Sequence, residues 1–202
     1  MGLLVVCVVF VVGGGMNKTL IVSGFPRSGT SLMMKMLHSA GIPVFADNHL
    51  SFESHYSNML PEDNQWLWAC RGYAVKILDP HIFTPPDQLE YKIVWMDRDR
   101  KEQARSQVKF LRHVGISIKK PDIGRLAKSL KKDRPTCIKL IENLSGGDFI
   151  TIRFEKLINK PIKTAIDIAK FIGVENVELK MAGCVKTRSP KALSYMMELE
   201  EL

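Results

Sequence analysis

The stretch from Thr19 to Ala40, TLIVSGFPRSGTSLMMKMLHSA, constrains the fold of this 202-residue chain more than any other. It begins with a short apolar run that ends at Ser23-Gly24, and a loop follows over residues 25–29. Beyond the loop, apolar residues recur at the spacing of one helical face, at Leu32, Met33, Met36, Leu37 and Ala40. The order of strand, glycine-bounded loop and helix predicts a βα unit, which is the building block of α/β folds.

The loop has the glycine spacing of a phosphate-binding loop. In the pattern G-x-x-x-x-G-K-[ST], Gly24 and Gly29 take the glycine positions, Thr30 replaces the lysine, and Ser31 supplies the last hydroxyl. Arg27 places a cation inside the loop instead. The helix that follows offers unpaired N–H groups and the positive end of its dipole, both of which attract anions. Because the missing lysine holds the β- and γ-phosphates in nucleoside triphosphatases, its absence argues against ATP or GTP chemistry. A βα turn with an incidental arginine is the alternative.

The run P-R-S-G-T-S at residues 26–31 resembles the 5′-phosphosulfate loop of sulfotransferases, whose usual form is P-[KR]-S-G-[ST]-[ST]. Those enzymes share the phosphate-loop fold and bind 3′-phosphoadenylyl sulfate (PAPS). The resemblance implies that the loop residues bind this sulfuryl donor and that Arg27 also takes part in catalysis. The implied cofactor-binding residues of the loop are Arg27, Ser28, Gly29, Thr30 and Ser31.

A second strand-to-helix junction supports the resemblance. Residues 92–96 are predicted to form a strand that ends in D-R-D-R, and a helix is predicted to follow. Sulfotransferases carry an arginine at the end of such a strand and a serine eight residues later, and both bind the 3′-phosphate of the cofactor. Arg98 and Ser106 have this separation, although Arg100 stands where proline is common. A helix-capping charge cluster is the alternative interpretation.

A third element, R-F-E-K-L-x-x-x-P at residues 153–161, follows a predicted strand at 149–153 and resembles the Y-E-D-L-x-x-x-P element of the family. The resemblance gives Glu155 a packing or capping role. An apolar helix follows, closed by Gly173, and a further helical segment from Asp122 could be interrupted at Pro135. Strands that alternate with helices predict an α/β fold of three layers, similar to that of P-loop NTPases, with a mainly parallel central sheet flanked by helices.

The residues that would perform the transfer are less well defined. Lys76 lies within a predicted core strand at residues 74–78, and a lysine there resembles one that several sulfotransferases place two residues before a catalytic histidine. Leu78 occupies the histidine position, and His81 lies three residues further on, so Lys76 and His81 join Arg27 as the candidate catalytic residues. The general base stays open among four side chains, Asp79, His81, Glu53 and His55.

Charge and cysteine content limit the choice of partners. The net charge is +8, and residues 98–139 hold 14 Lys or Arg against 4 Asp or Glu, an excess that favours anionic partners. A solvated helical face is the alternative interpretation. Without aromatic interleaving or a reader motif, we expect no nucleic acid. The four cysteines are scattered, which predicts reduced thiols and no metal site.

Residues 1–15 are predicted to be an apolar extension, and residues 16–202 a single domain. The apolar run at 3–12 is too short to span a bilayer as a helix and lacks the basic start of a secretory signal, which predicts a cytoplasmic protein. A weak membrane contact through this run is the alternative.

The sequence therefore predicts a PAPS-dependent sulfotransferase that acts on a hydroxyl or amine acceptor of unknown identity. One alternative is a small-molecule kinase with a degenerate phosphate loop, which needs Mg²⁺ and a displaced lysine. The other is a non-catalytic nucleotide- or anion-binding relative of the sulfotransferases.

Overall fold

The computed structural model of the chain describes residues 17–48, 51–116 and 122–185, so the apolar run at 3–12 and residues 186–202 lie outside the described part. The strands are β1 (Thr19–Gly24), β2 (Val44–Phe45), β3 (Ala74–Leu78), β4 (Tyr91–Asp97) and β5 (Phe149–Arg153). The helices are α1 (Thr30–Ser39), α2 (Arg100–His113), α3 (Ile123–Ser145), α4 (Phe154–Asn159), α5 (Pro161–Ile172) and α6 (Glu178–Gly183). Two short 3-10 helices are η1 (His55–Met59) and η2 (Gln65–Cys70).

The five strands form one sheet in the order β2-β3-β1-β4-β5, and every pairing is parallel. The central strand β1 carries Leu20, Ile21 and Val22, each no more than 1% exposed, because both faces of the sheet are covered. Gly24, at the end of β1, pairs with Leu78 and Met96. The carboxyl ends of these strands therefore meet at one edge, where parallel α/β sheets bind ligands.

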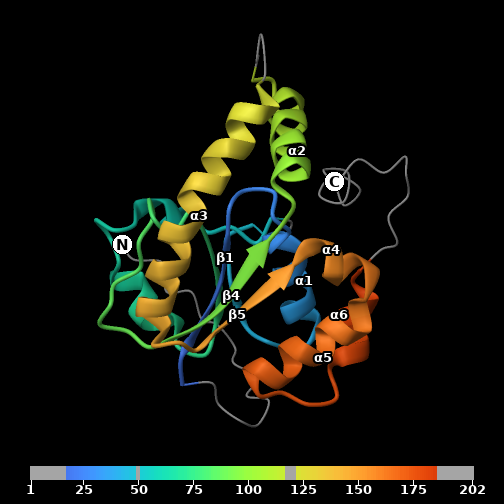
Figure 1. Ribbon diagram of the computed structural model, residues 1–202. Coiled ribbons are helices and arrows are strands. Elements are labelled where there is room, and N and C mark those ends of the chain that lie inside the picture. The colour runs from blue at the N-terminus through green and yellow to red at the C-terminus, as the bar shows by residue number, and fades with distance from the viewer. Residues whose placement is uncertain (1–16, 49–50, 117–121, 186–202) are drawn as a thin grey trace.

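Helices cover both faces of the sheet (Figure 1). Alternate residues of the strands point to opposite faces, and they form two hydrophobic clusters. One cluster joins the sheet to α1, α4, α5 and α6, and the other joins it to α3 and η2. The predicted three-layer α/β fold with a parallel sheet is confirmed.

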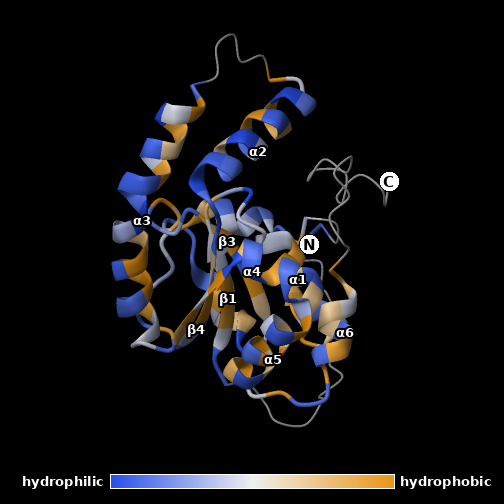
Figure 2. Ribbon diagram, turned by 45° about the vertical axis from the view of Figure 1, so that its right-hand side comes forward, coloured by the Kyte–Doolittle hydropathy of each residue, from blue (hydrophilic) through white to orange (hydrophobic). Residues whose placement is uncertain are grey.

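Helices α2 and α3 lie against each other and extend beyond the carboxyl edge of the sheet (Figure 1). Figure 2 shows hydrophilic residues along the outer sides of both helices. Contrary to the break considered at Pro135, α3 continues through it. Leu130, Cys137 and Ile141 are buried in one cluster on either side of the proline, and this packing holds the helix together despite the lost backbone hydrogen bond.

Candidate active site

The loop between β1 and α1 is tightly folded and depends on Gly29. The N–H of Ser28 donates to the carbonyl oxygen of Phe25 at 3.1 Å, and Arg27 has a φ of 66°. Gly29 is the N-cap residue of α1 and has a φ of 105°, and a Cβ at this position would lie 2.5 Å from Cδ2 of Phe154. Both the backbone angle and the contact exclude a side chain, so this glycine lets the loop pack onto α4.

The loop also contains a buried hydroxyl without a partner. Ser28 is 1% exposed, and its Oγ has no hydrogen-bond partner among the described residues. A buried polar atom left unpaired is costly unless a ligand or water serves it. This observation, together with the amino end of α1, fits a phosphate group held at the loop.

Arg98 directly follows β4 and is turned inward against the loop. Only 7% of the residue is exposed, and its Nη1 donates to the carbonyl oxygen of Arg27 at 2.9 Å. Its Cζ lies 4.5 Å from the centre of the Phe154 ring, a cation–π contact. Phe154 thus contacts both Gly29 and Arg98, and so joins the third sequence element to the first two.

Helix α2 packs on the other side of the loop. Gln103 donates from Nε2 to the carbonyl oxygen of Pro26 at 2.8 Å, and Arg27 donates from Nε to Oγ of Ser106 at 3.4 Å. The guanidinium of Arg27 also lies 5.0 Å from the ring centre of Phe110. The structure therefore brings together Arg27, Arg98 and Ser106, three of the candidate site residues, and places Arg27 in contact with both of the others.

Sequence reasoning missed Gln103 and Phe110 as parts of this site. Their separation from Ser106 by three and four positions places all three on one face of α2. This helical spacing was the available signal.

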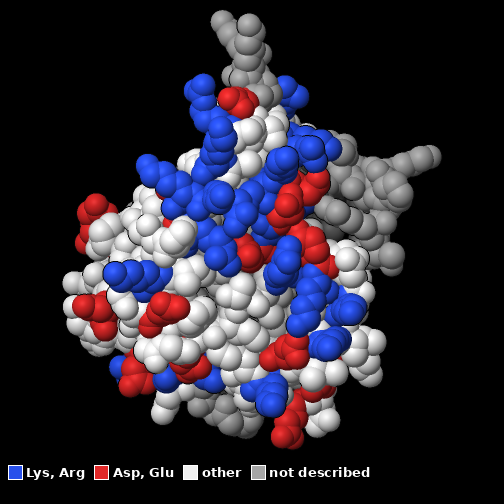
Figure 3. All heavy atoms as spheres, viewed as in Figure 1, with Lys and Arg blue, Asp and Glu red and all other residues white. Residues whose placement is uncertain are grey.

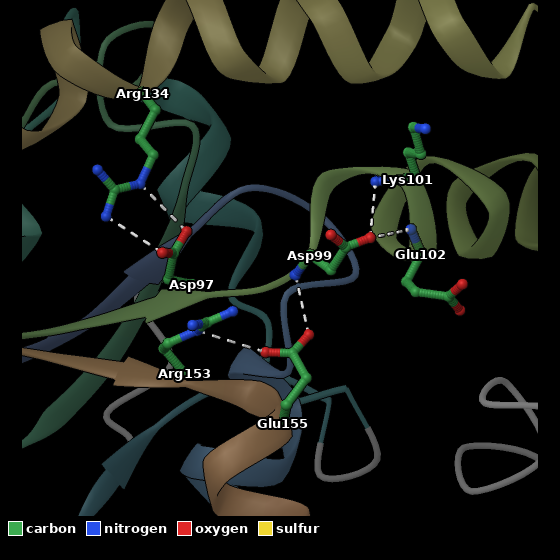
Figure 4. A network of polar contacts seen from close by, with 7 residues as sticks. All are labelled: Asp97, Asp99, Lys101, Glu102, Arg134, Arg153 and Glu155. Carbon is green, nitrogen blue, oxygen red and sulfur yellow. Dashed lines mark hydrogen bonds and ion pairs between the residues drawn. The ribbon is translucent and has the colours of Figure 1, made fainter.

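A network of polar contacts fixes the β4–α2 junction (Figure 4). The carboxylate of Asp99 caps α2 by accepting from the backbone N–H groups of Lys101 and Glu102. The N–H of Asp99 in turn donates to Oε1 of Glu155 at 2.9 Å. Glu155, for which the sequence predicted a packing or capping role, thus supports the backbone next to Arg98.

Two further ion pairs in the same network hold neighbouring elements in place. Arg134 of α3 makes a two-point contact with Asp97 at 3.1 and 3.2 Å, and Arg153 lies 3.8 Å from Glu155 (Figure 4). Because Asp97 and Glu155 lie on either side of the strand end, the backbone that carries Arg98 is supported from α3 and from α4.

Lys76 is a buried cation that reaches the phosphate loop from β3. Its side chain is 3% exposed, and Nζ donates to Oγ of Ser31 at 2.9 Å, to the carbonyl oxygen of Ser51 at 2.8 Å and to Oε1 of Glu53 at 2.7 Å. These three acceptors offset the cost of burying the charge. Of the predicted candidates for the base, Glu53 therefore lies beside Lys76 and the end of the loop.

His55 lies close in sequence but is engaged by another carboxylate. Oδ2 of Asp47 accepts from the backbone N–H of His55 at 2.8 Å and contacts its Nδ1. The backbone hydrogen bond is the main cause that lowers the pKa of Asp47. The ring of His55 also packs against Tyr56, at 3.9 Å between ring centres.

His81 contacts Phe25 and α3, and Asp79 is hydrogen-bonded to the end of β1. Nδ1 of His81 is 3.1 Å from Sγ of Cys137, and its ring meets the Phe25 ring edge-on. The N–H of Asp79 donates to the carbonyl oxygen of Gly24 at 3.2 Å. Burial raises the pKa of Asp79 to about 6 and that of the Cys137 thiol to about 12.

Within residues 17–48, 51–116 and 122–185, no group of three or more His, Cys, Asp or Glu side chains is arranged to hold a metal ion. In the same ranges, Cys70, Cys137 and Cys184 are free thiols. None of the helices described there combines the length and the apolar character needed to cross a membrane.

No family model matches this sequence, and no curated protein sequence matches it. Solved structures do. Mouse sulfotransferase SULT7A1 complexed with PAP has a TM-score of 0.57 at 15% identity, over 89% of this chain and 69% of that one. Retinol dehydratase in complex with androsterone and the inactive cofactor PAP has a TM-score of 0.53 at 15% identity, over 82% of this chain and 62% of that one.

The sulfotransferase domain from the curacin biosynthetic pathway has a TM-score of 0.53 at 12% identity, over 92% of this chain and 96% of that domain. This chain thus spans less than two thirds of the retinol dehydratase chain but nearly the whole of the curacin domain. The resemblance to sulfotransferases is confirmed at the level of the fold: the chain has a sulfotransferase fold.

Proposed function

We propose that this protein is a PAPS-dependent sulfotransferase that transfers a sulfuryl group to a hydroxyl or amine acceptor. The observation that carries the proposal is the placement of Arg98 and Ser106 against the phosphate loop, where both contact Arg27. A site for a 5′-phosphate alone needs only the loop. The two additional donors beside it fit a ligand that carries a second phosphate, as PAPS does. Two of the structures with the same fold, mouse SULT7A1 and retinol dehydratase, are complexes with PAP, the desulfated product.

Each phosphate of the ligand would be bound by a different set of residues. The loop residues Ser28 to Ser31 would hold the 5′-phosphate through backbone N–H groups and hydroxyls. Arg98 supplies a planar donor and Ser106 a directional one for the 3′-phosphate. Arg27 would neutralise the charge that develops on the bridging oxygen as the sulfur–oxygen bond breaks.

The transfer itself needs positioning and charge stabilisation more than covalent help from the protein. The acceptor oxygen or nitrogen forms a bond to sulfur, the bond from sulfur to the bridging oxygen breaks, PAP leaves, and the acceptor proton passes to a base. Lys76 would contact the sulfuryl group because its Nζ lies beside Ser31. Glu53 is our choice of base, since its carboxylate contacts Lys76, whereas His81 contacts Cys137 and Phe25.

One observation favours a small-molecule kinase as the second candidate. The kinase hypothesis requires a lysine displaced from its usual place in the loop, and Lys76 reaches Ser31 from the neighbouring strand. The two hypotheses differ in the nucleotide that they require. A kinase binds ADP with Mg²⁺ and is stopped by EDTA, whereas a sulfotransferase requires the 3′-phosphate.

Calorimetric titration with PAP and with ADP tests the proposal. We expect wild type to bind PAP at least ten-fold more tightly than ADP, and Arg98→Ala and Ser106→Ala to remove that preference. Arg71→Ala, which removes an exposed arginine elsewhere, is the matched control and is expected to keep it. Equal affinity for ADP, or no binding of either nucleotide, would contradict the proposal. PAP binding without transfer to any acceptor would favour the non-catalytic relative.

A further inference from the structure

The positive charge of this protein is concentrated in two helices. α2 carries five Lys or Arg and one acidic residue, and α3 carries six and two, an excess of eight positive charges. The whole chain has a net charge of +8, so the rest of the sequence is balanced. We call α2 and α3 together the basic arm.

Most of these cations lie on the surface and are not neutralised by neighbours. Among the described residues, carboxylates pair with three of the arm's arginines, Arg105, Arg125 and Arg134. Exposed lysines extend along both helices at Lys101, Lys109, Lys128, Lys131 and Lys132. Figure 3 shows Lys and Arg gathered over α2 and α3 on the face turned to the viewer. Such a field attracts an anionic partner from a distance and is screened by salt.

The spacing of the charges favours a partner with many charges in a row. Lys101, Arg105 and Lys109 are four positions apart, which separates them by about 6 Å along the axis of α2. The stripe begins next to Arg98, at the β4–α2 junction. A linear polyanion can therefore follow the arm to the phosphate loop.

The exposed side chains of the arm argue against single-stranded nucleic acid and against a protein as the partner. Within α2 and α3, the exposed positions carry charged or small polar side chains, apart from His113, Gly124 and Pro135. The large exposed apolar residues of the described chain lie outside both helices, although Val114 and Ile116 directly follow α2. Recognition of single-stranded nucleic acid uses aromatic side chains that stack on bases, and protein interfaces use aromatic anchors. A hydrated, charged carbohydrate needs neither.

We infer that the basic arm binds an acidic polysaccharide, a linear glycan with carboxylate or sulfate groups on neighbouring sugars, and that this glycan is the acceptor. The hydroxyls of its sugars are the groups that would receive the sulfuryl group. The identity of the acceptor rests on the proposed function, but the binding surface does not, because the charges of the arm exist independently of any nucleotide site.

The test measures binding of a fluorescent heparin octasaccharide to the full chain by anisotropy, at about 0.05 M and 0.2 M salt and without nucleotide. The arm variant combines Lys101→Gln, Lys109→Gln, Lys131→Gln and Lys132→Gln. The matched control combines Lys160→Gln, Lys163→Gln, Lys170→Gln and Lys180→Gln, which removes the same charge from exposed positions near α5 and α6. Single-stranded oligoadenylate of equal charge and vesicles with phosphatidylserine are the competing probes.

We expect the arm variant to lose at least ten-fold in affinity for the octasaccharide and to show a weaker salt dependence. The control is expected to lose less than two-fold. Equal losses in both variants, or tighter binding of oligoadenylate or vesicles than of the octasaccharide, would overturn the inference. PAP titration of the same variants separates the two proposals: an arm-specific loss of glycan binding in a protein that does not bind PAP would support the surface and reject the sulfotransferase.

Discussion

Nη1 of Arg98 donates a hydrogen bond to the backbone carbonyl oxygen of Arg27 at 2.9 Å. A residue at the end of β4 is thereby tied to the middle of the loop that follows β1, across 71 positions of sequence. The ring of Phe154 stacks on the same guanidinium in a cation–π contact. Three sequence elements that are far apart in the chain thus meet at one cation, and their contacts fix its orientation before any ligand arrives.

Removing the ring of Phe154 should affect stability and ligand binding together. Phe154→Ala deletes a buried side chain that contacts both Gly29 and Arg98, and we expect the free energy of unfolding to fall by about 3 kcal/mol. PAP affinity should fall as well, because Arg98 loses its support. Urea unfolding and calorimetry measure the two effects. Phe154→Tyr keeps the ring and is the control; unchanged PAP affinity in Phe154→Ala would show that the ring does not position Arg98.

The requirement for glycine at position 29 can be separated into an angular and a steric part. Gly29→Ala meets both an unfavourable φ and a contact at 2.5 Å with Phe154. Gly41→Ala, at the other end of α1, meets only a positive φ of 83° with nothing within 4 Å. We expect a loss of about 1 kcal/mol for Gly41→Ala and a larger loss for Gly29→Ala. Thermal and urea unfolding give both values, and similar losses would indicate that the loop moves away from Phe154 freely.

The pair formed by Lys76 and Glu53 is asymmetric, because the Lys76 side chain is 3% exposed and that of Glu53 is 54% exposed. Glu53→Gln removes the negative charge that faces a buried ammonium, whereas Lys76→Met leaves a carboxylate that water can reach. We therefore expect Glu53→Gln to lower the free energy of unfolding by about 1–2 kcal/mol and Lys76→Met by less.

The double variant completes a thermodynamic cycle for this pair. Once Lys76 is methionine, adding Glu53→Gln should cost almost nothing in stability. Equal costs in both backgrounds, measured by urea unfolding, would mean that the two side chains do not interact. Sulfuryl transfer should be strongly reduced in all three variants, because both residues are proposed to act in it.

The buried carboxyl of Asp79 is expected to make the protein less stable as the pH rises. Burial raises its pKa from an ordinary value of 3.8 to about 6 in the folded state. The folded protein therefore binds a proton on the Asp79 carboxyl more tightly than the unfolded chain does. The stabilisation that comes from this difference is greatest below pH 4 and is lost as the pH rises to about 6. Asp79→Asn removes this dependence, and asparagine tolerates the φ of 46° at this position.

We expect Asp79→Asn to be more stable than wild type at pH 8 by about 2 kcal/mol, with the difference shrinking toward pH 4. Urea unfolding between pH 4 and pH 8 measures it. Asp87→Asn, which changes an exposed carboxylate, is the control. A difference between Asp79→Asn and wild type that does not vary with pH would contradict the assignment.

Much of the architecture could be predicted because local patterns carried it. The glycine spacing at 24 and 29, the apolar stripe from Leu32, and the strand before Arg98 specify βα units through periodicity and turn chemistry, which depend on near neighbours in sequence. The parallel sheet follows, since βα units that repeat must stack their strands in one direction. The continuity of α3 through Pro135 could not be predicted in this way, because the burial of residues on both sides of the proline decides whether the helix continues.

The sequence by itself identified the phosphate loop, Arg98 and Ser106 as candidate site residues, because loop, strand end and helix are each local patterns. Only the tertiary structure decided which of these residues touch. It placed Arg27 against both Arg98 and Ser106, sent Lys76 to Glu53 and Ser31, and set His81 against Cys137. Side-chain partners across the sheet depend on packing between distant segments, and no spacing within one segment encodes that packing.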